Sequence, residues 1–229
     1  PNQHDWRNFT TKMQQYYEIG PSYVSFIDLA YFNGVLRGID NTVKCSGVVS
    51  NTINRLEGHD LYFELGEKSV FQGRFTSSGL PKVWNTLFDI ELTDAHLNPD
   101  DLESVYLPWF GMNISVPSPL HELEYVDFSR IHFNGTLEDF AVTAQSVTPA
   151  LEGGLKFVYK PCEGDSVDCS RMYGDFDFNR VNYGKFTGMD LLKTGGLSGT
   201  YSGKLDTTGT SFNVKGRLDR LNVQKGQLR

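Results

Sequence analysis

The chain has 229 residues, of which 39% are hydrophobic and 13% aromatic, so its composition is that of a folded protein and not of a disordered one. Its formal net charge of -7 and the lack of a basic run argue against a nucleic-acid partner. No apolar stretch is long enough to cross a bilayer, and residues 1–4 are not a signal peptide. The abrupt ends, with strand-like sequence at the C-terminus, lead us to expect a fragment of a longer protein.

A short phrase recurs along the chain: an apolar residue, a spacer, a glycine, a spacer and another apolar residue. Its copies lie at residues 32–36, 45–49, 71–75, 133–137, 201–205 and 212–218. Successive side chains of a strand point to opposite faces, so each phrase predicts a strand with one apolar face and a glycine gap in it. The repeated gap favours a sheet that curls around a lumen, although alternation alone fits a β-sandwich equally well.

The first half of the chain predicts strands over 60–65, 70–76 and 87–92, because apolar and polar residues alternate there between turn residues. A helix is predicted over 98–106, since Asn98 is a capping residue that is followed by proline and two acids. Residues 6–17 and 28–32 are weaker helical candidates.

The second half of the chain predicts strands throughout. We expect them at residues 131–137, 141–146, 155–160, 173–178, 181–186, 197–205 and 211–223. A proline-rich loop separates the halves, so we divide the chain into an N-terminal β segment, residues 1–107, ending in a short helix, and a C-terminal β segment, residues 108–229. Strand propensity continues across the division, which allows one continuous sheet or two domains. We expect all-β structure with one or two short helices, an antiparallel sheet curled into an open trough that both segments share.

Two of the three cysteines, Cys162 and Cys169, flank a short polar segment. A disulfide between them is favoured over two free thiols and would require an oxidising compartment. Cys45 takes an apolar position of a strand phrase and is expected to be a small buried hydrophobe.

Catalytic motifs do not assemble along the chain. The five histidines do not stand at metal-ligand spacing, and the strand glycines are not arranged to cradle phosphate. The acid pairs Asp100–Asp101 and Asp175/Asp177 suit a helix start and the outward positions of a strand. We therefore predict no enzyme activity, no metal and no cofactor.

Several motifs follow one another in a recognisable order from about residue 41 onward. They are Leu61-x-Phe63-x-Leu65-Gly66, Val70 to Phe75, Gly79-Leu80-Pro81, Asn85 to Asp89, Ile131 to Leu137, Asp139-Phe140, Gly174 to Asp177, Tyr183-Gly184-Lys185, Gly216 to Leu221 and Lys225-Gly226-Gln227. In this order the chain resembles the TamB proteins of the translocation and assembly module, specifically their Bacteroidota-type relatives within the AsmA-like superfamily. The cysteine segment departs from the family pattern.

The resemblance implies a β-taco, a long sheet folded into an open trough with an apolar inner surface. TamB-like proteins are anchored in the inner membrane, cross the periplasm and partner an outer-membrane barrel of the TamA/BamA type. The resemblance therefore implies a periplasmic segment of a bridge that conducts phospholipids along an apolar groove, assists outer-membrane protein assembly, or does both. A periplasmic location agrees with the expected disulfide.

The inward strand positions are our candidate groove residues, expected to contact lipid. They are Phe71, Phe75, Ile131, Phe133, Leu137, Leu197, Tyr201, Leu205, Phe212, Val214 and Leu218. One alternative is a β-sandwich module of a cell-surface protein that binds carbohydrate or protein, for which Trp6, Trp84 and Trp109 would group on one rim. A surface hydrolase is a further alternative and requires converging carboxylates and a cleft.

Overall fold

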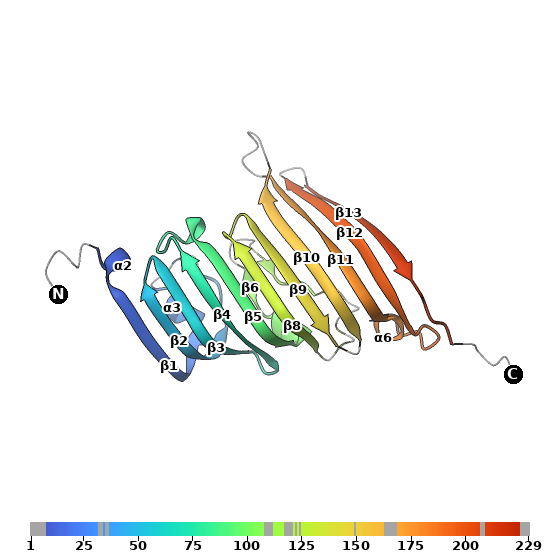
Figure 1. The fold of residues 1–229 in the computed structure, drawn as a ribbon, viewed down its shortest axis with the longest axis horizontal. Helices are drawn as coiled ribbons and strands as arrows, with labels where there is room; N and C mark the ends of the chain where they lie inside the picture. The colour runs from blue at the N-terminus through green and yellow to red at the C-terminus, as the bar shows by residue number, and fades with distance from the viewer. Residues whose placement is uncertain are drawn as a thin grey trace.

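A computed structural model describes residues 8–31, 34, 37–107, 112–116, 121, 123, 125–148, 150–162, 169–206 and 209–224. Eleven antiparallel strands form one open sheet in which strands that follow one another in this sheet are also neighbours in space (Figure 1). The strands are β1 (Gln14–Ser25), β2 (Thr42–Thr52), β3 (Arg55–Leu65), β4 (Ser69–Ser78), β5 (Leu87–Leu97), β8 (Val126–Gly135), β9 (Phe140–Val147), β10 (Leu151–Pro161), β11 (Ser170–Asn182), β12 (Thr194–Asp206) and β13 (Gly209–Asp219). The predicted fold class, an all-β open curled sheet, is confirmed.

The remaining elements are short. Two-residue strands β6 (Tyr106–Leu107) and β7 (Met112–Asn113) form a separate small sheet, and β6 lies behind the main sheet in Figure 1. The helical turns are α2 (Phe9–Lys12), α3 (Phe26–Leu29), η2 (Val83–Asn85), α4 (Pro99–Glu103) and α6 (Tyr183–Thr187). Within the described ranges no second large sheet packs on the first, so the sandwich arrangement is not what this sequence forms. Because β5 pairs directly with β8, the strands before and after residues 98–125 belong to one sheet.

Strand register gives the sheet two different faces, because residues directly opposite each other on antiparallel strands share a face. One residue from each strand defines the apolar face: Val24, Val43, Phe63, Phe71, Ile90, Phe133, Val142, Phe157, Phe176, Tyr201 and Val214. The opposite positions, such as Arg74, Glu91 and His132, define the polar face. The sheet is therefore a single layer with one apolar face and one polar face.

β-Bulges keep the apolar residues on one side where their spacing is odd. Phe128 and Ile131 are three positions apart, yet both lie on the apolar face because the β8–β9 register shifts between Phe128 and Arg130. Between β10 and β11 the extra residue is Asn179 on β11, so Phe178 and Val181 share the apolar face although they are three positions apart. Opposite it lies Gly153 on β10, whose φ of 145° is easily adopted only by glycine.

The glycine gaps of the apolar face are filled by aromatic rings from neighbouring strands. The ring of Phe75 on β4 lies over Gly58 on β3, where a Cβ atom would overlap it. Tyr201 on β12 reaches over Gly174 on β11, and its hydroxyl donates to the carbonyl oxygen of Lys156 on β10 at 2.8 Å. The gaps thus seat large rings in the sheet's own surface, which is the aromatic rescue known for glycines in strands.

Several predicted elements differ from the structure. The expected strand over 181–186 ends at Asn182, whose side chain caps α6 by accepting from the Lys185 N–H at 3.3 Å. The helix expected over 98–106 is only five residues long, and residues 106–107 are the strand β6. β8 ends at Gly135, so Leu137 lies in a turn.

The N-terminal region also differs from expectation. Residues 6–17 do not form one helix: among the described residues α2 covers Phe9–Lys12 and β1 begins at Gln14. Gly20 and Pro21 occupy a register shift in β1, where an edge strand tolerates proline. The weak helical candidate at 28–32 is the turn α3 at Phe26–Leu29. Of the phrase at 32–36 only Gly34 lies within the described residues.

The predicted disulfide is confirmed. Cys162 and Cys169 join the end of β10 to the start of β11 with their Cα atoms 5.3 Å apart, and the Cys162 N–H donates to the Cys169 carbonyl oxygen at 3.0 Å. Cys45 is buried on β2 and free, and burial raises the pKa of its thiol.

Candidate functional site

The apolar face carries a row of aromatic rings that crosses the sheet from β8 to β13. We define the aromatic row as Phe133, Phe140, Phe157, Tyr159, Tyr201 and Phe212. Ring centroids are 5.0 Å apart for Phe133–Phe140, 5.3 Å for Phe140–Tyr159, 6.3 Å for Phe157–Tyr201 and 6.1 Å for Tyr201–Phe212. These are contact distances for aromatic pairs, so the row is a continuous surface perpendicular to the strands.

The β13 end of this surface is open to solvent. Phe212, Val214 and Leu218 all lie on the apolar face, and each side chain is more than half exposed. The sheet holds few fully buried large side chains, because a single layer covers only one side of each residue. Soluble proteins rarely leave contiguous apolar surface uncovered unless something binds there.

Tyr201 shows how the aromatic row is held. Its hydroxyl is bound to the Lys156 carbonyl, so the ring lies flat across β11 and does not extend into solvent. Burial raises the pKa of Tyr201 and the nearby Asp175 carboxylate adds to the rise, so the hydroxyl stays a donor at neutral pH.

A second part of the apolar face is covered. The strap, which we define as residues 98–107 and 112–116, and the helix α6 lie over the strand ends near Leu97, Val126 and Val181. Between these elements and the sheet lies a pocket of about 470 Å³ that is partly open to solvent, the covered pocket. Its principal lining side chains are Leu97, Phe128, Leu155 and Leu197 from the sheet, Leu102 from α4 and Phe186 from α6.

The strap is fastened to the sheet by polar contacts around α4. The Asp101 carboxylate accepts the backbone N–H groups of Glu67, Lys68 and Ser69 at 3.1, 3.0 and 2.7 Å. Burial alone would raise the pKa of Asp101, but these donors outweigh it and hold the pKa below its ordinary value. Gly66 makes room for the carboxylate, which a side chain there would displace.

Two further contacts fix the path of the strap. The Asn98 side chain caps α4 by accepting from the Asp100 and Asp101 N–H groups, and the Asn98 N–H donates to the buried Ser69 Oγ at 2.9 Å. The Glu103 carboxylate accepts the Val116 N–H at 3.0 Å, which ties the far side of the strap back to α4.

Ten of the eleven candidate groove residues lie on the apolar face, and the exception is Leu137 in the β8–β9 turn. Phe133, Tyr201 and Phe212 belong to the aromatic row, and Leu197 lines the covered pocket. Phe71 stacks on Phe63 nearer the N-terminal edge, with centroids 5.2 Å apart.

Sequence reasoning missed other residues of this face. Phe140, Phe157 and Tyr159 complete the aromatic row. Phe157 and Tyr159 alternate within the predicted strand 155–160, and Phe140 directly precedes the predicted strand 141–146. Phe186 and Leu102 were not found because they belong to covering elements, whose contacts with the sheet are distant in sequence.

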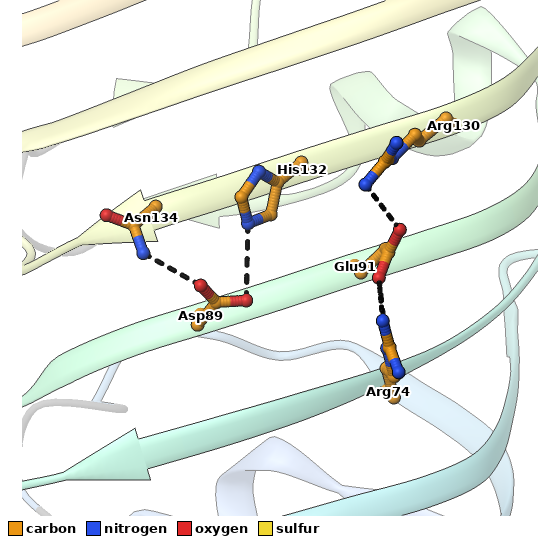
Figure 2. Close-up of polar contacts among 6 residues, drawn as sticks. All are labelled: Arg74, Asp89, Glu91, Arg130, His132 and Asn134. Atoms are coloured by element: carbon orange, nitrogen blue, oxygen red, sulfur yellow. Dashed lines mark hydrogen bonds and ion pairs between the residues drawn. The ribbon is translucent and has the colours of Figure 1, made fainter.

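The polar face carries ladders of charged and polar side chains across β4, β5 and β8 (Figure 2). Glu91 on β5 lies between two arginines, with Nε of Arg74 2.9 Å from Oε2 and Nη2 of Arg130 2.8 Å from Oε1. The hydrogen bond from Arg74 holds the pKa of Glu91 below its ordinary value, although partial burial opposes this, and Arg130 adds to the lowering. Asp89 lies between His132, 3.2 Å away, and Asn134, which donates to Oδ2 at 2.8 Å.

Features that other functions would require are not assembled in the described part of the chain. No group of three His, Cys, Asp or Glu side chains could hold a metal ion there. Asp175 and Asp177 point from the polar face of β11, across from Lys156 and Gly154. Of the three tryptophans proposed for a carbohydrate-binding rim, Trp84 is exposed, while Trp6 and Trp109 lie outside the described residues.

The chain was compared with known proteins at three levels. No protein-family model matches it, no curated protein is similar to it, and no solved structure has a matching fold. Among the described helices, none combines the length and the apolarity that a bilayer span requires.

Proposed function

We propose that this chain is a segment of a TamB-like bridge that guides lipid acyl chains along its apolar face. On this proposal it works in the periplasm, within a protein anchored in the inner membrane that reaches an outer-membrane barrel of the TamA/BamA type. It is a lipid-binding surface and not an enzyme. Assistance to outer-membrane protein assembly is the second activity of such a bridge.

The observation that carries the proposal is an apolar face that crosses all eleven strands and stays open at the β13 end. A groove for acyl chains needs that continuity, because each methylene that leaves water contributes about 0.8 kcal/mol and would lose it at any polar interruption. The polar face, with its exposed ion pairs, remains in water (Figure 2). On this proposal the sheet lies between the bound acyl chain on one side and solvent on the other.

The proposal is tested by identifying lipids that co-purify with the protein from a native envelope. We expect phospholipids by mass spectrometry, bound in amounts that fall severalfold in Phe133→Asp and Val214→Asp, because a carboxylate on the apolar face is costly to bury beside a chain. Circular dichroism should show that both variants remain folded, since both sites are only partly covered.

Thr143→Asp and Thr200→Asp are matched controls on the polar faces of β9 and β12. They add the same charge to the same sheet and should leave lipid content unchanged. Protein that carries no lipid, or equal losses in the apolar-face and polar-face variants, would contradict the proposed function.

A further inference from the structure

The covered pocket has the chemistry of a site for an uncharged hydrocarbon. Its wall is apolar apart from the hydroxyls of Ser115 and Tyr183, and the Tyr183 hydroxyl is already committed to the Gly196 carbonyl oxygen at 3.1 Å. A ligand with buried polar groups would leave them without hydrogen-bond partners here, which costs free energy. The pocket lies within the size range of small-ligand sites and is lined as they are.

The volume of the pocket sets how much hydrocarbon it holds. An apolar cavity of about 150 Å³ accommodates benzene, that is, six carbons. At the same density, about 470 Å³ holds roughly 18 carbons. This corresponds to one long acyl chain and excludes the two chains of a phospholipid together.

The position of the pocket connects it to the aromatic row. On β10, Leu155 of the pocket comes two positions before Phe157 of the row, and on β12 Leu197 comes four positions before Tyr201. At about 3.3 Å per residue the two surfaces are adjacent bands of one face. An acyl chain in the pocket therefore leaves the rest of the lipid molecule beside the aromatic row.

We infer that the covered pocket binds a single acyl chain of a lipid, in a fixed seat beneath the strap and α6, while the remainder of the molecule lies along the aromatic row. This inference rests on the proposed function and makes it more specific, because it names the place on the apolar face where an acyl chain binds. The strap is anchored by Asp101 and α6 is capped by Asn182, so both covers have defined positions over the chain.

The test is titration of the purified chain with palmitate, followed by calorimetry and native mass spectrometry. We expect one palmitate per protein. For saturated fatty acids of increasing length, affinity should rise by up to about fourfold per methylene and level off near roughly 18 carbons, when the pocket is full. A surface without walls would instead give a continuous rise and several bound molecules.

Leu102→Trp fills the pocket from the strap side and leaves the sheet unchanged, so it should weaken palmitate binding by roughly tenfold or more. Thr200→Asp on the polar face of β12 is the control and should change palmitate affinity less than twofold. If Leu102→Trp fails to fold, the length series on the unaltered chain decides.

The possible results separate the two proposals. The pocket inference would be overturned if Leu102→Trp left palmitate affinity unchanged, if more than one palmitate bound per protein, or if affinity showed no limit with fatty-acid length. Each of these results would leave the proposed function standing. Binding of no fatty acid, together with no co-purified lipid, would overturn both.

Discussion

Gly174 on β11 leaves the space through which Tyr201 on β12 reaches the Lys156 carbonyl on β10. An added Cβ would overlap the Lys156 carbonyl and lie 2.7 Å from the Tyr201 hydroxyl. Gly174→Ala should therefore displace the Tyr201 ring and destabilise the fold by about 1–3 kcal/mol, the range for overpacking. Urea unfolding followed by tyrosine fluorescence measures this.

Gly20 is the control for that substitution, because nothing lies within 4 Å of a Cβ built there. Gly20→Ala should change the free energy of unfolding by less than about 0.5 kcal/mol. Equal effects at the two glycines would mean that Tyr201 is not seated through the gap at Gly174.

Glu91 gives the polar face a dependence on pH. Its folded-state pKa is lowered by the arginines, so the stabilisation it contributes is present above its unfolded value, about 4.3, and is lost as pH falls through the folded pKa. The free energy of unfolding should exceed that of Glu91→Gln at pH 7, and the difference should shrink toward pH 3.

The double variant Arg74→Gln/Arg130→Gln provides the reference for Glu91. With both guanidinium groups removed, the pH dependence of the Glu91→Gln difference should largely disappear. Persistence of the full pH dependence would show that the ion pairs are not its source.

At the scale of elements, the strap depends on one carboxylate. Asp101→Ala removes the acceptor of three backbone N–H groups and should cost about 1.5–3 kcal/mol, the value for hydrogen bonds to a charged group. Amide hydrogen exchange at residues 67–69 should accelerate, and palmitate affinity should fall because the cover over the pocket loosens.

Asp100→Ala is the matched control, since the Asp100 side chain is largely exposed and its carboxylate lies 3.5 Å from Nδ1 of His121. It should leave both exchange and stability close to the unaltered values. Because the pKa of Asp101 is lowered, the stabilisation from this anchor should be present at neutral pH and be lost as pH falls through that lowered pKa. If both substitutions accelerate exchange equally, the strap is not held by Asp101.

Strands were the elements that the sequence predicted best, because apolar alternation is a local property. The core of every expected strand after residue 60 is found, except that 181–186 becomes α6 once Asn182 caps it. β1 was missed because the loosely spaced apolar residues of 6–17 suggested a helix, and the strand becomes evident only from its pairing with β2. The strap could not be placed, since Asp101 meets the β3–β4 turn more than 30 residues away.

The candidate groove residues were chosen because their period-two spacing predicts one shared face of the sheet. In the structure the β-bulges keep these positions on the same face. Phe133, Tyr201 and Phe212 meet as one row although they come from three different phrases. What the sequence did not distinguish is an open part from a covered part of the face. That difference depends on Leu102 and Phe186, which belong to no strand.

At the scale of the whole molecule, each strand of the large sheet pairs only with the strands next to it in order. Among the described residues, ending the chain at Asp206 removes β13 and the single β-bridge between Leu192 and Val223, but no pairing between the other ten strands of the sheet. We expect the shortened chain to fold and to keep the covered pocket, with a urea m-value reduced by roughly a tenth, in proportion to the surface lost. Collapse of all tertiary structure would show cooperativity across the entire sheet.

The sequential pairing of strands has a consequence for how such a molecule grows. A hairpin inserted between two existing strands would need no new crossing and no rerouting of its neighbours, as in solenoids built from stacked units. The width of the sheet then scales with the number of hairpins, so duplication or loss of a hairpin can widen or narrow it without altering the strands at either edge.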